Sequence, residues 1–295
     1  MKAFVIAEHA DAATALAAGA RTMADEVVVA IVGAEQVPAQ IADSAYRVSV
    51  PADAVADDAD ATLAPIAADA QLVIAEPTRH IKSIVGKLAA AAGASVITDA
   101  MSVADGVAEQ MYFGGVGVIK RKAATGTTFI TAKTTAFGDA QASGANGDAE
   151  ELAWVAPAHP VKLVSSEPVE KSGADLTKSE AIVAAGRGFS EEADLELARA
   201  LCAKIDAGLG CTRPLAEANG WMPTETYIGV SGLQLSPKVY IGIGVSGQMQ
   251  HMVGANHSGT VFAINKDQNA PIFKQCDYGL IGDLKSVLPA LADAL

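Results

Sequence analysis

A glycine turn with a histidine a few residues downstream is the part of this sequence with the clearest chemistry. Residues 239–266 read VYIGIGVSGQMQHMVGANHSGTVFAINK, which predicts an apolar strand, a glycine turn, a short helical start that carries His251, and a second apolar strand. In such a turn the backbone N–H groups come close to a pyrophosphate, and the helix N-terminus favours its negative charge. The segment therefore predicts a dinucleotide site with a histidine beside it.

Two other turns in the second half of the chain carry arginines. The run GRGF, which contains Arg187, follows the apolar residues 181–185, and the run GCTRP contains Thr212 and Arg213. The proline of GCTRP suits the first position of a helix, which would leave Thr212 and Arg213 at the end of a strand. Each turn alone is a weak signal, because arginines are common in surface loops.

Composition excludes several classes of partner. The chain has 295 residues, of which 51% are hydrophobic and 19% charged, so it can form two domains with cores of ordinary size. Its net charge of −13 argues against a nucleic-acid or anionic-membrane partner. Three cysteines without metal-ligand or disulfide spacing fit a reducing cytoplasm. The N-terminal run MKAFVIAEHA is too short for a signal peptide or membrane span and is expected to be a buried strand.

The first half alternates short apolar runs with alanine-rich helical stretches. Residues 81–92 repeat apolar side chains at spacings of three and four, as on one face of a helix. Such alternation predicts an α/β domain with a mostly parallel sheet. Residues 111–137 are β-rich without an intervening helix, which predicts antiparallel strands, so the sheet is expected to be mixed. The strand candidates are residues 3–7, 26–32, 46–50, 72–75 and 95–98.

The sequence predicts two domains. Residues 138–151 and 165–178 are both polar, and the second stretch, with a proline and a glycine before a fresh strand, is the better linker. We expect an N-terminal mixed α/β domain over residues 1–170 and a C-terminal domain over residues 178–295 with a doubly wound parallel sheet. In the latter, Ser190 is expected to cap a helix. The buried stripe of that helix is expected to be Leu195, Ala198, Leu201, Cys202 and Ile205.

Several motifs of the second half resemble, in order and spacing, the alpha subunit of electron-transfer flavoproteins. They are TR at 212–213, GVSG at 229–232, SGQMQH at 246–251, INKDQNAPIF at 264–273 and DYGLIGD at 277–283. The likeness covers most of residues 181–295, whereas the first half is similar mainly in strand pattern and in YFGG at 112–115. This resemblance implies an FAD held mainly by the second domain.

The resemblance also implies contacts for individual residues. Arg213 is implied beside the flavin ring, Ser231 at the edge around N5, and His251 at the C2 carbonyl. A cation or hydrogen-bond donor in that region stabilises negative charge on the flavin, so Arg213 and His251, charged or as a donor, would favour an anionic semiquinone and one-electron transfer. Thr212 is implied beside Arg213, residues 246–250 along the ribityl and pyrophosphate, Arg187 at the phosphates, and Asn265 and Asp283 at the adenosine end. The full set of other implied contacts is Arg187, Thr212, Ile228, Gly229, Val230, Ser246, Gly247, Gln248, Met249, Gln250, Asn265, Asp283 and Leu284.

The same resemblance implies a role and partners. The FAD would shuttle electrons between an acyl-CoA dehydrogenase or reductase and a second redox partner, in a heterodimer whose beta subunit holds AMP or a second FAD. The chain would be an electron carrier that turns over only with partner enzymes. GVSG stands where many members have GQTG, which retains a hydroxyl at Ser231 but loses an amide and puts bifurcation-type tuning in doubt. With Trp221 and Tyr227, this variant looks like the branch linked to carnitine-type or other enoyl-CoA metabolism.

Two other classes stay open on the residues alone. A glycine turn does not distinguish FAD from NAD(P), so an NAD(P)-binding oxidoreductase domain is one alternative, which predicts a colourless protein. The other is a non-catalytic nucleotide-binding module built on the first domain. That domain has no glycine-rich phosphate loop after any predicted strand, and the run EPTR at 76–79 is expected to face a partner. We therefore expect the first domain to pack on the beta subunit.

Overall fold

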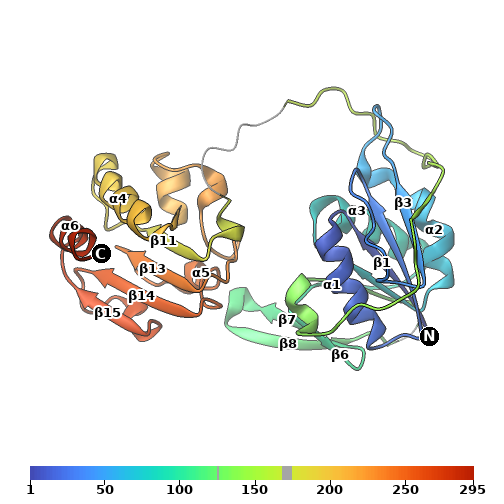
Figure 1. Cartoon of the computed structure of the whole chain (residues 1–295), viewed down its shortest axis with the longest axis horizontal. Helices are drawn as coiled ribbons and strands as arrows, with labels where there is room; N and C mark the ends of the chain where they lie inside the picture. The colour runs from blue at the N-terminus through green and yellow to red at the C-terminus, as the bar shows by residue number, and fades with distance from the viewer. Residues whose placement is uncertain (125, 168–174) are drawn as a thin grey trace. The chain divides into compact units, whose positions relative to one another are not determined.

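A computed structural model describes residues 1–124, 126–167 and 175–295 (Figure 1). These residues form two compact units, one made of residues 1–112 and 118–167 and the other of residues 113–117 and 175–295. Each unit has its own parallel sheet and its own core. The α/β class predicted from the alternation of apolar runs and helices is confirmed.

The first unit is built on a seven-stranded sheet with the order β10-β3-β2-β1-β4-β9-β5, in which the described neighbours all pair in parallel. Three helices connect its strands. The strands are β1 (Lys2–Ala7), β2 (Glu26–Val32), β3 (Ser44–Val48), β4 (Leu72–Ala75), β5 (Val96–Ala100), β9 (Thr128–Ala132) and β10 (Glu150–Glu151), and the helices are α1 (Ala10–Arg21), α2 (Asp60–Asp69) and α3 (Arg79–Ala91).

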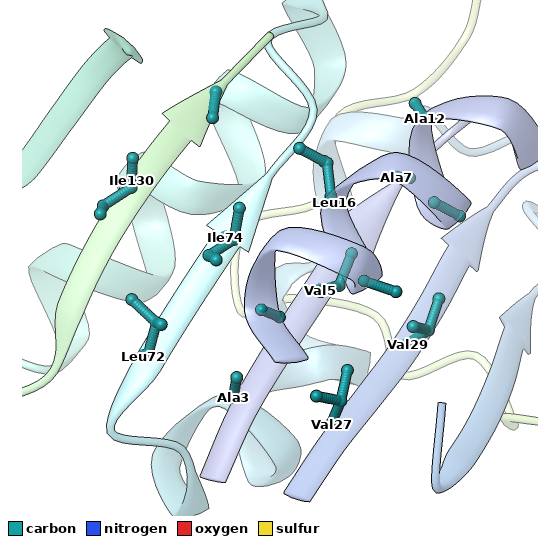
Figure 2. Close-up of a cluster of buried hydrophobic side chains, with 14 of the residues drawn as sticks. Ala3, Val5, Ala7, Ala12, Leu16, Val27, Val29, Leu72, Ile74 and Ile130 are labelled. Atoms are coloured by element: carbon teal, nitrogen blue, oxygen red, sulfur yellow. The ribbon is translucent and has the colours of Figure 1, made fainter. Parts of the chain in front are cut away.

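The central strands of this sheet are apolar on both faces because helices cover both faces. Side chains at alternate positions of β1 enter two separate cores: Val5 packs with α1, and Ile6 packs with α2 and α3. Figure 2 shows Leu16 of α1 close to Val5 and Ile74, which belong to β1 and β4. A strand buried on both faces cannot show an alternating polar pattern, which explains its continuous apolar sequence.

The expectation of a mixed sheet is wrong. Strands β6 (Ser102–Ala104), β7 (Val107–Tyr112) and β8 (Gly117–Lys122) form a separate three-stranded sheet, in which β6 and β7 are antiparallel. Strand β8 has no buried residue, so it cannot lie inside a sheet that is covered on both faces. Strand β9 is buried at four of its five residues and enters the main sheet between β4 and β5, parallel to both.

The polar residues 138–151 belong to the first unit. Asn146 is buried, and its side-chain oxygen accepts hydrogen bonds from the N–H groups of Ile41 and Ala42, both at 2.8 Å. Strand β10 then pairs with β3. This stretch is therefore held on the first unit by hydrogen bonds of its own side chains and backbone.

The chain after β10 has no helix or strand up to residue 167, yet it is fastened to the first unit. The N–H of Val155 donates to the Thr62 hydroxyl at 2.9 Å, and the N–H of Val161 donates to the buried Asp58 carboxylate at 2.7 Å. Lys87 lies 2.8 Å from the other oxygen of Asp58. Of the predicted linker 165–178, residues 168–174 lie outside the described residues, so the domain boundary stays a prediction.

The first sheet changes winding direction at β1, since β2 lies on one side of it and β4 on the other. Glu76, which follows β4, is 8% exposed and accepts hydrogen bonds from the N–H groups of Glu8 and His9, at 2.7 Å and 3.1 Å. Its other oxygen lies 2.6 Å from Nδ1 of His9 and raises the pKa of that ring. Glu35 accepts the N–H of Ala10 at 2.6 Å. The backbone N–H groups before and at the start of α1 are thus already hydrogen-bonded to carboxylates of Glu76 and Glu35.

The second unit contains a five-stranded parallel sheet with the order β12-β11-β13-β14-β15. Helices α4 and α6 pack against one face (Figure 1), over a core that includes Val183 and Ile243. Met252 and Ile272 belong to the core on the other face. The strands are β11 (Ala181–Ala185), β12 (Gly208–Cys211), β13 (Val239–Ile243), β14 (Thr260–Asn265) and β15 (Tyr278–Ile281), and the helices are α4 (Leu195–Ile205), α5 (Met249–Met252) and α6 (Leu284–Ala294).

Helix α4 begins later than predicted. Glu191 is extended, with φ −137° and ψ 147°, so no helix can begin at Ser190. A 3-10 turn over Glu192–Asp194 precedes the helix instead, and Asp194 forms an ion pair with Lys285 at 3.0 Å. The predicted stripe is buried except for its last member, which is half-buried: Leu195, Ala198, Leu201, Cys202 and Ile205.

Candidate functional site

A cavity of about 800 Å³ lies at the carboxyl ends of strands β11, β12 and β13. The second sheet changes winding direction at β11, because β12 lies on one side of it and β13 on the other. Open parallel sheets bind ligands at this point. The volume lies within the range of cofactor and drug-sized pockets, roughly 300–1,000 Å³.

Two glycines bring the loops after β11 and β13 into backbone contact. The N–H of Gly188 donates to the carbonyl of Gly244 at 2.9 Å, and a Cβ on Gly244 would lie 2.7 Å from the Cα of Gly188. Gly244 also has a φ of +61°, which favours glycine. Both glycines line the cavity, so this part of its wall is bare backbone.

The helix expected after the glycine turn is short. Gly247, with φ +81°, packs against the backbone of Ile272, where a Cβ would lie 2.3 Å from the nitrogen. Helix α5 then begins at Met249 and has four residues. A helix of one turn has a small dipole, so an anion at this position would have to be bound by loop N–H groups and arginines more than by the helix N-terminus expected from the sequence.

The loop at 228–233 is fixed to both sides of the cavity. The N–H of Ile228 donates to the carbonyl of Cys211 at the end of β12, at 2.9 Å. The N–H of Val230 donates to the carbonyl of Gln250 in α5 at 2.8 Å, and a Cβ on Gly229 would lie 2.7 Å from that same carbonyl oxygen. These hydrogen bonds fix the position of Ser231 relative to helix α5, which carries His251.

His251 lines the cavity and is 8% exposed. Its Nε2 lies 2.6 Å from the hydroxyl of Tyr240, while its buried Nδ1 has no hydrogen-bond partner among the described residues. Burial lowers the pKa of His251 to about 4; the backbone of Ile228 lies near the ring and opposes this shift by a smaller amount, but it makes no hydrogen bond of normal geometry with Nδ1. The ring is therefore neutral at pH 7. This favours a role as a neutral hydrogen-bond donor over a role as a cation.

The hydroxyl oxygen of Thr212 is, after Nδ1 of His251, a second buried polar atom in the cavity wall. This oxygen has no hydrogen-bond partner among the described residues, and the residue is 9% exposed. Leaving such an atom unpaired costs about 1–3 kcal/mol. With Nδ1 of His251, it makes the cavity suited to a ligand that has its own hydrogen-bonding groups.

Two arginines give the cavity positive charge in a chain whose net charge is −13. Arg187 is exposed at the turn after β11, and Arg213 is exposed at the end of β12. Nε of Arg213 donates to Glu217 at 2.6 Å, and this hydrogen bond raises the pKa of the arginine. Pro214 begins a π-helical turn over Pro214–Ala218, as its predicted helix-starting role requires. An anionic dinucleotide such as FAD therefore fits the residues that are present.

Most of the predicted cofactor contacts come together at this cavity. The small cavity of about 10 Å³ beside it shares Gly188, Gly244 and Asn265 with it and is also lined by Asp283 and Leu284. The predicted residues that line the large cavity are Arg187, Thr212, Arg213, Ile228, Gly229, Val230, Ser231, Ser246, Gln248, Gln250, His251 and Asn265.

Two predicted contacts lie elsewhere. Gly247 faces Ile272, and Met249, which is 41% exposed, does not line either cavity. Asp283 has a structural task as well, because its carboxylate accepts the N–H of Lys285 at 3.1 Å at the start of α6.

Sequence reasoning did not identify Glu217 or Tyr240 as part of the site. The spacing of four between Arg213 and Glu217 could have indicated a pair on one turn. Tyr240 lies inside an apolar strand and had the pattern of an ordinary core residue. Glu217 and Tyr240 act behind the wall, through Arg213 and His251; the residues that line the cavity and were not predicted as contacts are Gly188, Pro214, Tyr227, Gly244, Val245, Asp267, Ala270 and Pro271.

A parallel α/β unit with a cavity at its switch point, lined by two arginines and bare glycine backbone, is typical of nucleotide-binding domains. Residues 175–256 match the family described as "Electron transfer flavoprotein FAD-binding domain". Over 229 residues the chain is 41% identical to Protein FixB of Escherichia coli O7:K1 (strain IAI39 / ExPEC), a match that covers 76% of this chain and 73% of that protein. Protein FixB of Escherichia coli O1:K1 / APEC and of strain K12 / DH10B match with the same identity and coverage. The chain belongs to the family of electron-transfer flavoprotein alpha subunits, an electron-transfer family that includes FixB.

Two further findings concern the described ranges. Their helices are all too short or too polar to span a bilayer. No group of three or more His, Cys, Asp or Glu side chains within residues 1–124, 126–167 and 175–295 is arranged to hold a metal ion.

Proposed function

We propose that this chain binds FAD in the large cavity of its second unit and carries electrons as the alpha subunit of a heterodimeric electron-transfer flavoprotein. The observation that carries the proposal is the pair of buried, unpartnered atoms in the cavity wall, Oγ1 of Thr212 and Nδ1 of His251, in a domain of a family described as FAD-binding. Bound FAD would supply reversible one-electron chemistry. The residues of this chain would bind it, orient it and set the charge around it.

The flavin end of the cofactor is proposed to lie between β12, the loop at 228–233 and α5. Arg213 would approach the ring, Ser231 the N5 edge and His251 the C2 carbonyl. A guanidinium and a neutral hydrogen-bond donor at that edge would favour the anionic semiquinone over fully oxidised flavin. Glu217 pairs with the guanidinium at 2.6 Å and would weaken the electrostatic effect of Arg213 on the flavin ring.

The phosphates and adenosine are proposed to extend over the glycine contact. Arg187 stands at the turn after β11, beside the bare backbone of Gly188 and Gly244. The small cavity lined by Asn265 and Asp283 opens from the same glycines, which supports placing the adenosine end there.

We further propose that the first unit packs on a beta subunit that carries AMP or a second FAD. Support comes from the carboxylates at the start of α1, which already occupy the crevice where a nucleotide phosphate would bind. The electron donor or acceptor would be an acyl-CoA dehydrogenase-type enzyme. Cys202 and Cys211, both buried free thiols, fit a cytoplasmic setting.

The test is to co-express the chain with the product of its neighbouring gene, purify the complex and count its flavin and nucleotide after extraction. One FAD with AMP would identify a simple carrier, and two FAD a bifurcating one. A complex that contains no flavin would refute the proposal. A colourless complex that binds NAD(P) would favour the oxidoreductase alternative.

A matched pair of variants addresses the cavity itself. Thr212→Val keeps the shape of the side chain and removes the unpartnered hydroxyl, so we expect FAD to bind about two- to tenfold more weakly. Thr260→Val makes the same change at the start of β14, outside both cavities, and is expected to leave FAD affinity unchanged. Equal affinities for both variants would argue that the hydroxyl does not meet the cofactor.

A further inference from the structure

The hydroxyl of Tyr240 is buried beneath the cavity and bonded to the ring of His251. Tyr240 is 1% exposed and belongs to the core that also contains Met252 and Ile272. The fold leaves room for this ring, since a Cβ on Gly242 would lie 3.2 Å from Cε1 of Tyr240 and 3.5 Å from its hydroxyl oxygen. The 2.6 Å bond to Nε2 of His251 is the hydrogen bond that the described residues offer this hydroxyl.

Both partners of this bond are neutral at pH 7. Burial raises the pKa of Tyr240 and lowers the pKa of His251 to about 4. The bond can therefore be made in two ways: the tyrosine O–H donates to Nε2, or an Nε2–H donates to the tyrosine oxygen. The two ways place the single ring proton on different nitrogens.

The surroundings favour the first arrangement. If Nε2 carried the proton, the hydroxyl proton of Tyr240 would need another acceptor, and the described residues offer this hydroxyl no hydrogen bond besides the one to His251. Buried donors are rarely left unpaired in folded proteins. If the hydroxyl donates to Nε2, its proton is satisfied and the ring proton lies on Nδ1, the atom without a protein partner among the described residues.

We propose that Tyr240 is a positioning residue that donates to Nε2 of His251 and so holds the ring as its Nδ1–H tautomer, which presents a hydrogen-bond donor to the ligand. The part of the ligand that meets Nδ1 is then an acceptor, such as a carbonyl oxygen. This role in redox tuning rests on the proposed FAD function, whereas the tautomer itself is a property of the protein without cofactor.

The tautomer is tested first, in the full-length chain stripped of cofactor. Histidine labelled with ¹⁵N has distinct nitrogen shifts and two-bond couplings for each tautomer, and the signal that disappears in His251→Gln identifies His251. We expect the Nδ1–H pattern at pH 7 in the wild type, and a shift towards Nε2–H in Tyr240→Phe. An Nε2–H pattern in the wild type would overturn the proposal, and this spectrum decides the matter even if Tyr240→Phe does not fold.

The consequence for the cofactor is tested in the FAD-loaded complex with its beta subunit. Tyr240→Phe keeps the ring and removes the donor, so we expect the equilibrium constant for adding the first electron to fall about three- to tenfold. Tyr278→Phe removes an exposed hydroxyl on β15 and is expected to leave both the potential and the tautomer unchanged. An unchanged first potential in Tyr240→Phe, with FAD bound and the tautomer shifted, would overturn the redox part of the proposal.

The two measurements separate this proposal from the proposed function. If the complex contains no flavin, the FAD function fails while the NMR result still reports whether Tyr240 sets the tautomer. If FAD is bound but His251 shows the Nε2–H pattern, the function stands and the role of Tyr240 is refuted.

Discussion

Gly244→Ala would test whether the backbone contact between two loops shapes the cofactor cavity. The new Cβ would lie 2.7 Å from the Cα of Gly188 and 2.9 Å from its nitrogen. Ordinary contacts of a Cβ begin near 3.4 Å, so the loops would have to part by about 0.7 Å. Alanine at a φ of +61° adds about 1–2 kcal/mol of backbone strain, and overpacking adds about 1–3 kcal/mol.

We therefore expect Gly244→Ala to lower the free energy of unfolding of the second unit by about 2–5 kcal/mol and to weaken FAD binding at least about tenfold. Gly220→Ala is the matched control, because Gly220 lies in the same unit with φ +67° and a Cβ added there would meet no atom within 4 Å. It carries the backbone strain without the clash, so a loss of about 1–2 kcal/mol and nearly normal FAD affinity are expected.

Urea denaturation followed by circular dichroism and by tryptophan fluorescence, in a Trp154→Phe background that leaves Trp221 of the second unit as the emitter, would measure the stability of the second unit. Titration with FAD, whose fluorescence changes on binding, would measure affinity. If the two alanine variants lose the same stability and the same affinity, the close approach of Gly188 and Gly244 has no role in shaping the site.

Three further predictions concern charge. Arg213→Ala is expected to reduce the semiquinone yield in a reductive titration with FAD still bound, and Glu217→Gln, which frees the guanidinium, is expected to increase it; an unchanged yield in both would refute the role of the pair. Because the pKa of His251 falls from 6.5 in the unfolded chain to about 4 in the folded one, the unfolded state takes up the proton first as pH falls. The free energy of unfolding of the second unit should then decrease between pH 6.5 and pH 4, by up to ~3 kcal/mol, and His251→Gln should remove this part of the pH dependence in urea titrations. Asp58→Asn is expected to destabilise the first unit by about 1–3 kcal/mol, because Lys87 loses its buried partner; a change below about 0.5 kcal/mol in urea denaturation would contradict this.

The sequence predicted the central strands better than the edges. The apolar runs 72–75 and 181–185 coincide with β4 and β11, which are buried on both faces. The run 46–50 begins two residues after β3 does, because β3 starts at Ser44, whose place is set by pairing with β2 rather than by its own hydrophobicity. The start of α4 was missed because Glu191, which suits a first helical turn by residue type, has an extended backbone with φ −137° and ψ 147°.

The site was predictable where it depends on short motifs and not where it depends on packing between elements. Glycine turns and polar residues at strand ends come together because parallel strands end at one edge of the sheet, so residues as distant as Arg187 and Asn265 line one cavity. The bond between Tyr240 and His251 joins a strand interior to a helix, and no local pattern distinguishes such a tyrosine from an apolar core residue. Likewise, the neutral state of His251 follows from burial, which the residue type alone does not reveal.

Glu76 bears on which of the two α/β units can bind a nucleotide at its switch point. Its carboxylate holds the N–H groups after β1 at 2.7 Å and 3.1 Å, so any phosphate that entered this crevice would have to displace an anion that is covalently part of the chain. Such a tethered competitor is always present at very high effective concentration, whatever the level of nucleotide in the cell. The two sheets both change winding direction at one strand, but the second unit has an open cavity at that point, whereas the first holds carboxylates of its own chain there.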